Sequence, residues 1–328
     1  MTPDFRILAD SVDVTDRLRD RLLSLRITDE AGIQSDTVEI YLDDRDGKID
    51  WPRHGAELDV SLGYRETGLT QQGLYIVDEV EHSGSPNTFT IRAKAADMRA
   101  SLKAQKTRSW DQLTIDDLVN TIAAEHDLTP KVNDVLGRFL MAHIDQSEES
   151  DLHLLTRLAK EYDAIAKPVS GFLVFAPQGD SKSVSDQDLP TVAIEPIQII
   201  RHRLTQADRG KYSSVKAYWH NTESAERVPV QVGDGEPVFT LRHTYANRQE
   251  AERAAESKLK SLQRGTASLN LTLLGNVELL VEGKLQLMNI RTGFDGEWII
   301  QRLEHQLNDQ GLVTRVESET PNPKGVNS

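Results

Sequence analysis

Hydrophobic and polar positions alternate along the first hundred residues. Leu23, Leu25 and Ile27 alternate with the polar residues Ser24, Arg26 and Thr28, and the same pattern recurs over 38–42 and 58–64. A period of two places every second side chain on one face, which is typical of half-buried antiparallel strands. Turn-forming runs of Asp, Gly, Pro and Ser separate these segments, at 43–47, 52–55 and 83–87. The pattern therefore predicts a barrel-like β domain over residues 1–105.

The pattern changes to a helical period in the middle of the chain. Thr114 followed by Asp117 has the spacing of a helix N-cap with an acidic partner, and an apolar stripe follows over 115–123. A second helix is predicted to begin at Ser147. Its N-terminal carboxylates, which would interact favourably with the positive end of the helix dipole, are Glu148, Glu149 and Asp151. The apolar stripe predicted for its buried face consists of Leu152, Leu155, Ala159 and Tyr162.

Strand-like segments at 164–169 and 171–175 complete this middle region, so we expect a small α+β domain over residues 106–195. The last third returns to strands and contains one helix, predicted over 247–264 with Asn247 as cap and Glu250 three residues later. Residues 196–328 are therefore predicted to form a second β domain with an inserted helix. The predicted strands of this region lie at 197–204, 213–220, 267–274, 284–290, 297–303 and 312–317.

The two β regions share sequence. Segment 73–82 aligns without gaps on 296–305, with the Gly, one Ile, the Glu and the His identical. A weaker match relates 37–42 to 214–219. Chance or shared β composition is the alternative explanation, but both matches fall in the same order. They favour duplication of an antiparallel β domain, with the α+β domain between the two copies.

Composition narrows the possible functions. The chain has 328 residues, with 52 acidic and 38 basic side chains and a net charge of −14. Nucleic-acid binders depend on clustered Lys and Arg, so this balance does not favour tight DNA or RNA binding. The absence of cysteine excludes disulfides, Cys-ligated zinc, iron–sulfur clusters and thiol nucleophiles. No apolar run approaches the ~18 residues of a membrane span, and no signal-peptide pattern occurs at the start, so we expect synthesis in the cytoplasm without membrane insertion.

Candidate chemistry is sparse. Asp44, Asp46, Gly47 and Asp50 occupy positions of a calcium-loop template, but Leu and Arg stand where two essential carboxylates belong, so a hairpin turn is expected. His82 and His305 occupy matching positions in the repeat, which indicates a repeated packing or hydrogen-bonding role. Segment 233–237 predicts a turn rather than a phosphate-binding loop, and no HExxH, G-x-S-x-G or Walker motif occurs. We therefore assign no catalytic, cofactor-binding or metal-binding residue.

The predicted helix over 247–264 has mixed charges on its outer face. Such a pattern is typical of a solvent-exposed face, with a docking surface for an acidic partner as the alternative.

Four stretches, at 42–64, 148–162, 245–255 and 296–317, resemble the late control D family of tail hub proteins from contractile-tailed bacteriophages. This family is related to the hub part of VgrG spike proteins in type VI secretion. The stretches cover most of the chain in the expected order. The resemblance implies a non-enzymatic structural protein with two tube-like β-barrels per chain.

The resemblance further implies a homotrimer at the centre of the baseplate, with six quasi-equivalent barrels. Such a ring would join the threefold central spike to the sixfold tail tube and nucleate assembly of the tube. Its expected partners are the spike, tail tube and baseplate wedge proteins, with the tape-measure protein as an additional candidate. DNA would only pass through the channel, whose wall would carry part of the acidic excess under our hypothesis. The same hub would serve an infectious phage or a headless tail-like bacteriocin.

Two other functions stay open from the residues alone. One is an acidic hydrolase that uses a pair of carboxylates in a cleft. The other is a β-rich adhesin that binds glycans, which predicts exposed aromatic side chains clustered on one face. The four tryptophans are spread along the chain, at Trp51, Trp110, Trp219 and Trp298, and provide no such cluster in the sequence.

Overall fold

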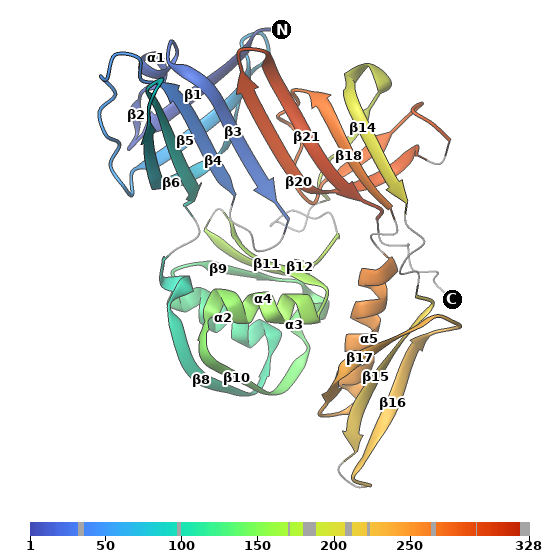
Figure 1. The fold of residues 1–328 in the computed structure, drawn as a ribbon. Coiled ribbons are helices and arrows are strands. Elements are labelled where there is room, and N and C mark those ends of the chain that lie inside the picture. The colour runs from blue at the N-terminus through green and yellow to red at the C-terminus, as the bar shows by residue number, and fades with distance from the viewer. Residues whose placement is uncertain are drawn as a thin grey trace.

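Strands from both ends of the chain form one 13-stranded sheet, while the middle of the chain folds separately (Figure 1). The computed structural model describes residues 1–31, 36–96, 100–169, 171–179, 188–206, 212–221, 224–263, 267–292 and 294–321. The predicted class, mainly β with two antiparallel barrel-like units and an α+β unit between them, is confirmed. None of the helices in these ranges has the length and apolar character needed to cross a membrane.

The first β unit folds its sheet over itself at one long strand, β6 (Gly68–Ser83). The first part of β6 pairs with β5 (Glu57–Tyr64) and the later part with β7 (Thr88–Ala95). A bulge between Val77 and Glu79 interrupts the ladder to β7, and bulges bend strands. The strand can therefore pass from one layer to the other. The remaining elements are β1 (Pro3–Ala9), β2 (Val12–Asp13), α1 (Thr15–Leu18), β3 (Leu22–Glu30) and β4 (Thr37–Asp43).

The alternating positions of this unit face a shared core. Leu25 and Ile27 are buried, as are the apolar positions predicted in β4 and β5. Leu23 is the exception, with 40% of its surface exposed. It lies where the β3–β4 register shifts between Leu22 and Ser24, so the extra residue turns its side chain outward.

The second β unit repeats this construction with a bent strand of its own, β20 (Gly296–Asn308). The first residues of β20 pair with β19 (Lys284–Leu287), and the rest pair with β21 (Gly311–Glu319). A bulge between Ile300 and Arg302 lies where the first β unit has its own bulge in the aligned sequence. The other elements are β13 (Thr191–Ile194), η2 (Pro196–Gln198), β14 (Ile199–Gln206) and β18 (Ala267–Leu274).

The two units join edge to edge. Seven residue pairs align β20 antiparallel to β3, from Arg302 opposite Glu30 to Asn308 opposite Ser24. We call this junction the seam. The strand order across it is β14-β18-β21-β20-β3-β4-β7-β6-β5-β1-β2.

Strand order corrects the weaker of the two sequence matches. The strand that corresponds to β4 is β18, because β4 lies between β3 and β7, and β18 lies between β14 and β21. Segment 214–219, which the sequence match relates to β4, belongs to a different sheet. Shared β composition produced that match, since alternating apolar residues fit any half-buried strand.

The segment between β14 and β18 forms a small unit of its own. The strand β15 (Ser214–Asn221) pairs with β16 (Glu226–Gly233) and β17 (Val238–Tyr245), and α5 (Arg248–Gln263) packs on this sheet. Asn247 accepts a hydrogen bond from the Glu250 amide, as its predicted cap role requires. The insertion is thus larger than the predicted helix. The strands at 226–233 and 238–245 were not predicted from the sequence.

The middle unit places two helices against short sheets. Thr114 caps α2 (Ile115–Glu125) with the predicted capping box to Asp117, and the helix packs its apolar stripe into a separate core. The other helix of full length is α4 (Asp151–Glu161), capped by Ser150. The remaining elements are η1 (Ala100–Lys103), β8 (Gln105–Thr114), β9 (Thr129–Val132), α3 (Asp134–Gly137), β10 (Leu140–Ser150), β11 (Ala164–Val169) and β12 (Phe172–Pro177).

The predicted start of the second helix at Ser147 is wrong. Residues 140–150 form β10, which pairs with β8 up to Ser150. Pairing with a distant strand therefore overrides the local helical signal, and only Asp151 of the three predicted carboxylates lies in the first helical turn. On the predicted buried face, Leu155 and Ala159 are buried, whereas Leu152 and Tyr162 are only partly buried.

One lysine links the middle unit to the first β unit. The Lys167 ammonium on β11 lies 2.7 Å from the Asp36 carboxylate and 3.1 Å from that of Asp29, and it donates to the Glu30 carbonyl oxygen at 3.0 Å. Burial, reinforced by the neighbouring Asp29 carboxylate, raises the pKa of Asp36 to about 7. Folding therefore shifts this carboxyl toward its protonated form relative to the unfolded chain.

This contact predicts a pH-dependent stability. A carboxyl whose pKa is raised on folding contributes stability that is full below its unfolded pKa and is lost as pH rises through the folded value. The Asp36 contribution should therefore fall between about pH 4 and pH 7, and Asp36→Asn should flatten this part of the curve. Urea denaturation midpoints from pH 4 to 8 measure the effect. Asp16→Asn, at an exposed carboxylate, is the control and should leave the wild-type curve unchanged.

Candidate functional site

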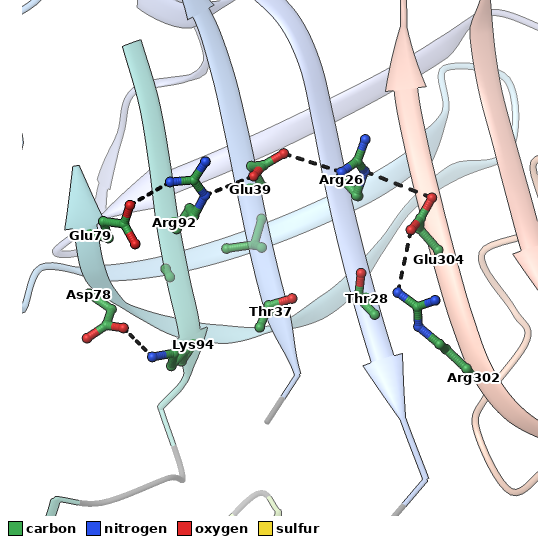
Figure 2. A pocket seen from close by; sticks show the side chains of 12 residues that line it. Arg26, Thr28, Thr37, Glu39, Asp78, Glu79, Arg92, Lys94, Arg302 and Glu304 are labelled. Atoms are coloured by element: carbon green, nitrogen blue, oxygen red, sulfur yellow. Dashed lines mark hydrogen bonds and ion pairs between the residues drawn. The ribbon is translucent and has the colours of Figure 1, made fainter. Parts of the chain in front are cut away.

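The outer face of the sheet carries a row of ion pairs that crosses the seam. Core-facing residues such as Leu25 and Ile40 alternate with charged residues on the opposite side. Figure 2 shows the row, which runs from β6 through β7, β4 and β3 to β20. The pairs are Glu79–Arg92 at 2.6 Å, Arg92–Glu39 at 3.0 Å, Glu39–Arg26 at 3.5 Å, Arg26–Glu304 at 3.9 Å and Glu304–Arg302 at 3.7 Å.

The row borders a shallow hollow of about 270 Å³. The lining includes four cationic and four acidic side chains, so the local charge is balanced rather than acidic. Exposed ion pairs contribute only about 0–1 kcal/mol each, because water screens them. The row therefore determines what the surface presents to a neighbour more than it stabilises the fold.

Glu81, which also binds Arg92, is poorly suited to acid catalysis. A hydrogen bond from the Arg92 guanidinium, followed by one from Ser83, lowers the pKa of Glu81. A general acid needs the opposite shift, toward the working pH. In the row itself each carboxylate is bound to a guanidinium group, an arrangement better suited to contact than to hydrolysis.

The second concentration of charge is buried in the middle unit, around Asp151. Its carboxylate accepts hydrogen bonds from Lys106 at 2.6 Å, Arg108 at 2.8 Å and Gln146 at 2.7 Å, and it contacts the His126 ring at 2.8 Å. Burial alone would raise the pKa of Asp151, but the bonds from His126, Lys106 and Gln146 outweigh it and lower the pKa to about 2. The carboxylate therefore stays ionised and ties α4 to β8, β10 and the end of α2.

Glu125, His126 and Asp151 have the proximity of metal ligands. Both oxygens of Asp151, however, already bind the Lys106 and Arg108 side chains, and Glu125 binds the same two cations at 2.7 and 2.6 Å. These cations occupy the positions that a metal ion would need. We therefore interpret the cluster as an internal ion-pair network.

The calcium-loop candidates form a turn. Asp44 is buried and accepts a hydrogen bond from the Ile49 amide at 3.1 Å, and Gly47 has a φ of 65°, in the region that favours glycine. Asp46 binds Arg21 through both oxygens, at 2.8 and 2.9 Å. Its carboxylate is therefore engaged by a cation of the chain.

The two matched histidines have different partners. His305 is buried, and its Nδ1 lies 2.9 Å from the Thr314 hydroxyl, while burial lowers its pKa to about 4. The half-exposed His82 instead lies 3.3 Å from the Asp44 carboxylate. Both serve packing and polar contacts within their own β unit, at equivalent points of β6 and β20.

The remaining sequence candidates lie apart from both charged clusters. Segment 233–237 forms the connection between β16 and β17, as predicted. Glu149 belongs to β10 and binds Arg157 at 2.8 Å, whereas the Glu148 side chain is exposed. On α5, Arg253 stacks over the Phe139 ring at 4.1 Å, so part of its charged face contacts the middle unit instead of solvent.

Sequence reasoning missed both charged clusters. The buried network had one usable signal, the alternation of Lys106 and Arg108 along a segment that pairs as a strand. The row had none, since it forms only when β4 pairs with β7 and β3 pairs with β20, strands that are distant in the chain. Only the pairing of those strands brings them together.

The buried network predicts a large effect for Asp151→Asn. Removing one partner of a buried ion pair costs about 3–5 kcal/mol, and we expect about 3 kcal/mol here because Lys106 and Arg108 keep Glu125 as a partner. Chemical denaturation at pH 7 measures the loss, with Glu148→Gln as the exposed control. Because folding lowers the pKa of Asp151, the wild-type contribution should persist above about pH 4 and fall toward pH 2. Equal stability of Asp151→Asn and wild type at pH 7 would contradict the role of the network.

Comparison with known proteins agrees with this architecture. The family model described as "Phage tail baseplate hub (GPD)" matches residues 51–311. The "Probable baseplate hub protein" of Escherichia phage 186 is 34% identical, over 97% of this chain and 93% of the relative. In fold, the 43 kDa tail protein of prophage MuSo2 from Shewanella oneidensis is similar at a TM-score of 0.72, with 13% identity and coverage of 97% and 98%. The c3393 protein of E. coli, a type VI secretion component, is similar at 0.56, with 11% identity and coverage of 93% and 74%. The chain belongs to the phage tail baseplate hub (GPD) family.

Proposed function

We propose that this chain is the structural hub at the centre of a contractile-tail baseplate. As a family member it is a structural component of the phage tail baseplate. The finer assignment is a homotrimer with pseudo-sixfold symmetry. It joins a trimeric central spike to the hexameric tail tube and provides the first surface on which the tube assembles.

The observation that carries this proposal is the repetition of one β unit within a single continuous sheet. Both units contain a bent strand with a bulge at the same aligned position, and the seam joins them through backbone pairing. Three chains with two such units each would form six similar units around an axis. A component with this arrangement can match threefold symmetry on one side and sixfold symmetry on the other.

The proposed partners follow from that position. The spike protein lies distally, the tail tube protein proximally and the baseplate wedge proteins at the rim, with the tape-measure protein as a further candidate. We also propose synthesis in the bacterial host cytoplasm and residence in the assembled tail particle. The proposed division into three units follows the predicted ranges 1–105, 106–195 and 196–328, with two adjustments at the boundaries: η1 packs with the middle unit and β13 pairs within the second β unit. Either an infectious phage or a tail-like bacteriocin could contain such a hub.

DNA enters this proposal only as cargo that passes through the channel. Our hypothesis of an acidic channel wall gains no support from the charged row, where carboxylates and cations are balanced. Such a surface would still bind a passing phosphate backbone only weakly, because each cation of the row already has a carboxylate partner.

The two alternative functions are not favoured by any specific contact. Carboxylates on the outer face are bound to guanidinium groups instead of being poised as an acid and a base. The aromatic cluster expected of a glycan-binding adhesin is not formed by the tryptophans. Trp110 and Trp298 are buried and Trp219 packs in the core of the inserted unit, which leaves only Trp51 exposed, at 59%.

Electron microscopy of purified tail particles tests the proposal. We expect three copies of the chain around the particle axis, between the spike and the first ring of the tube. Quantitative mass spectrometry of the same particles, with the tail tube protein as internal standard, should give the matching copy number. Density for the chain away from the axis, or a single copy on it, would contradict the proposed function.

A further inference from the structure

Four strands of the long sheet, β2, β13, β14 and the later part of β6, have an edge without a neighbour within the described residues. The edges of β14 and β6 are the two that correspond to the edges joined at the seam. β14 pairs only with β18 and ends the sheet. The later part of β6, from Glu79 to Ser83, pairs with β7 on one side, and β5 reaches only to Ile76 on the other. Unpaired edges expose backbone donors and acceptors and are ready templates for another strand.

The chain itself shows what fills the corresponding edge of β20. That strand has the same bulge as β6, and its later part pairs with β21 on one side and with β3 on the other. The strand that pairs with the edge of β20 is therefore β3 of the first β unit. In the second β unit, the strand equivalent to β3 is β14, and its edge is unpaired within the described residues.

The correspondence between β3 and β14 holds residue by residue. Ile27 lies opposite Val38 of β4, and Leu204 lies opposite Leu269 of β18, the strand equivalent to β4. Each strand has a register shift at the matching place, between Leu22 and Ser24 in β3 and between Ile199 and Arg201 in β14. The aligned residues around these pairs are Leu25-Arg26-Ile27-Thr28 and His202-Arg203-Leu204-Thr205.

We infer that β14 of one chain pairs antiparallel with the later part of β6 of the next chain, in the register of the seam. This inference rests on the proposed trimer and adds the edges and the register that hold it together. In the seam, His305 lies opposite Ile27, Glu304 opposite Thr28 and Gln306 opposite Arg26. Replacing each seam residue by its equivalent in β6 or β14 gives the pairs expected between chains. They are His82 with Leu204, Glu81 with Thr205 and Ser83 with Arg203.

Charge complementarity supports this pairing. The edge of β6 presents Glu79 and Glu81, which is 48% exposed, and the edge of β14 presents the exposed Arg201 and Arg203. Across the seam, Arg26 and Glu304 approach to 3.9 Å. Their equivalents are Arg203 and Glu81, so the same ion pair would form between chains.

The shape of the interface also fits a closed assembly. The two edges differ, so each chain contributes one of each to its neighbours in a head-to-tail arrangement. Such an interface forms a ring when the rotation closes and an open filament when it does not. With three chains, the seam and the new junction would alternate around one continuous sheet.

Cysteine cross-linking in tail particles tests the register. The chain has no cysteine of its own, so Ser83→Cys combined with Arg203→Cys reports a single contact. Opposed residues of antiparallel strands have Cα atoms about 4.5–5.5 Å apart, within the range of a disulfide. After oxidation and denaturation, we expect covalent dimers and trimers but no larger species. Glu81→Cys with Thr205→Cys is a second pair, on the same face, for use if the first prevents assembly.

The matched control moves the second cysteine along β14 by two residues, from position 203 to position 201, so that it stays on the same face of the strand. Ser83→Cys with Arg201→Cys separates the thiols beyond disulfide reach in the inferred register, so its yield should be much lower. Equal or greater cross-linking by the control would overturn the register. Failure of both inferred pairs in particles with three axial copies would overturn the seam inference and leave the proposed hub intact. A single copy per particle would overturn the proposed function itself.

A charge exchange provides an independent measurement on the purified chain. Glu81→Arg and Arg203→Glu should each raise the trimer dissociation constant several-fold, since an exposed ion pair accounts for about two- to five-fold. The combined variant should recover most of the loss, as seen by analytical ultracentrifugation. Additive losses in the combined variant would contradict the pairing of these two residues.

Discussion

Backbone pairing between β20 and β3 is the interaction on which the architecture depends. It turns two separate β units into one sheet and fixes their relative orientation, because seven residue pairs must align at once. A register error of one residue would turn the side chains of β20 to the opposite face relative to β3, placing Leu303 and Leu307 in solvent and Glu304 in the core. The hydrophobic core on one side and the charged row on the other therefore both enforce the same alignment.

Bulges allow each β unit to enclose its own core while it also takes part in the shared sheet. β6 and β20 each run through two layers, and each bends where one residue is left out of the ladder. The later part of each strand lies in the long sheet, while the first part covers the core from the other side. The same bulged strand, present once in each β unit, thus both covers the core of its unit and contributes an edge to the long sheet.

The middle unit is held by a different kind of force. Its helices and hairpin surround a buried carboxylate with cations, and Lys167 attaches it to the first β unit beside Asp29 and Asp36. Buried ion pairs are costly to desolvate but costly to break, so they favour one arrangement over others more than they add stability. Such defined contacts hold the middle unit in one position relative to the first β unit.

The sequence by itself determined the strands with period-two alternation, the capped helices at Thr114 and Asn247 and the repeat of 73–82 at 296–305. These features depend on neighbours within a few residues or on a direct comparison of two segments. It misplaced the start of α4, missed β16 and β17 and matched β4 to the wrong strand. The start of α4 and the neighbours of β4 depend on strands distant in the chain, whereas β16 pairs with the preceding strand β15. Alternation indicates a half-buried strand without specifying its neighbour. The ion-pair row, the Asp151 network and the free edges arise only from that pairing, so the tertiary structure alone decided them.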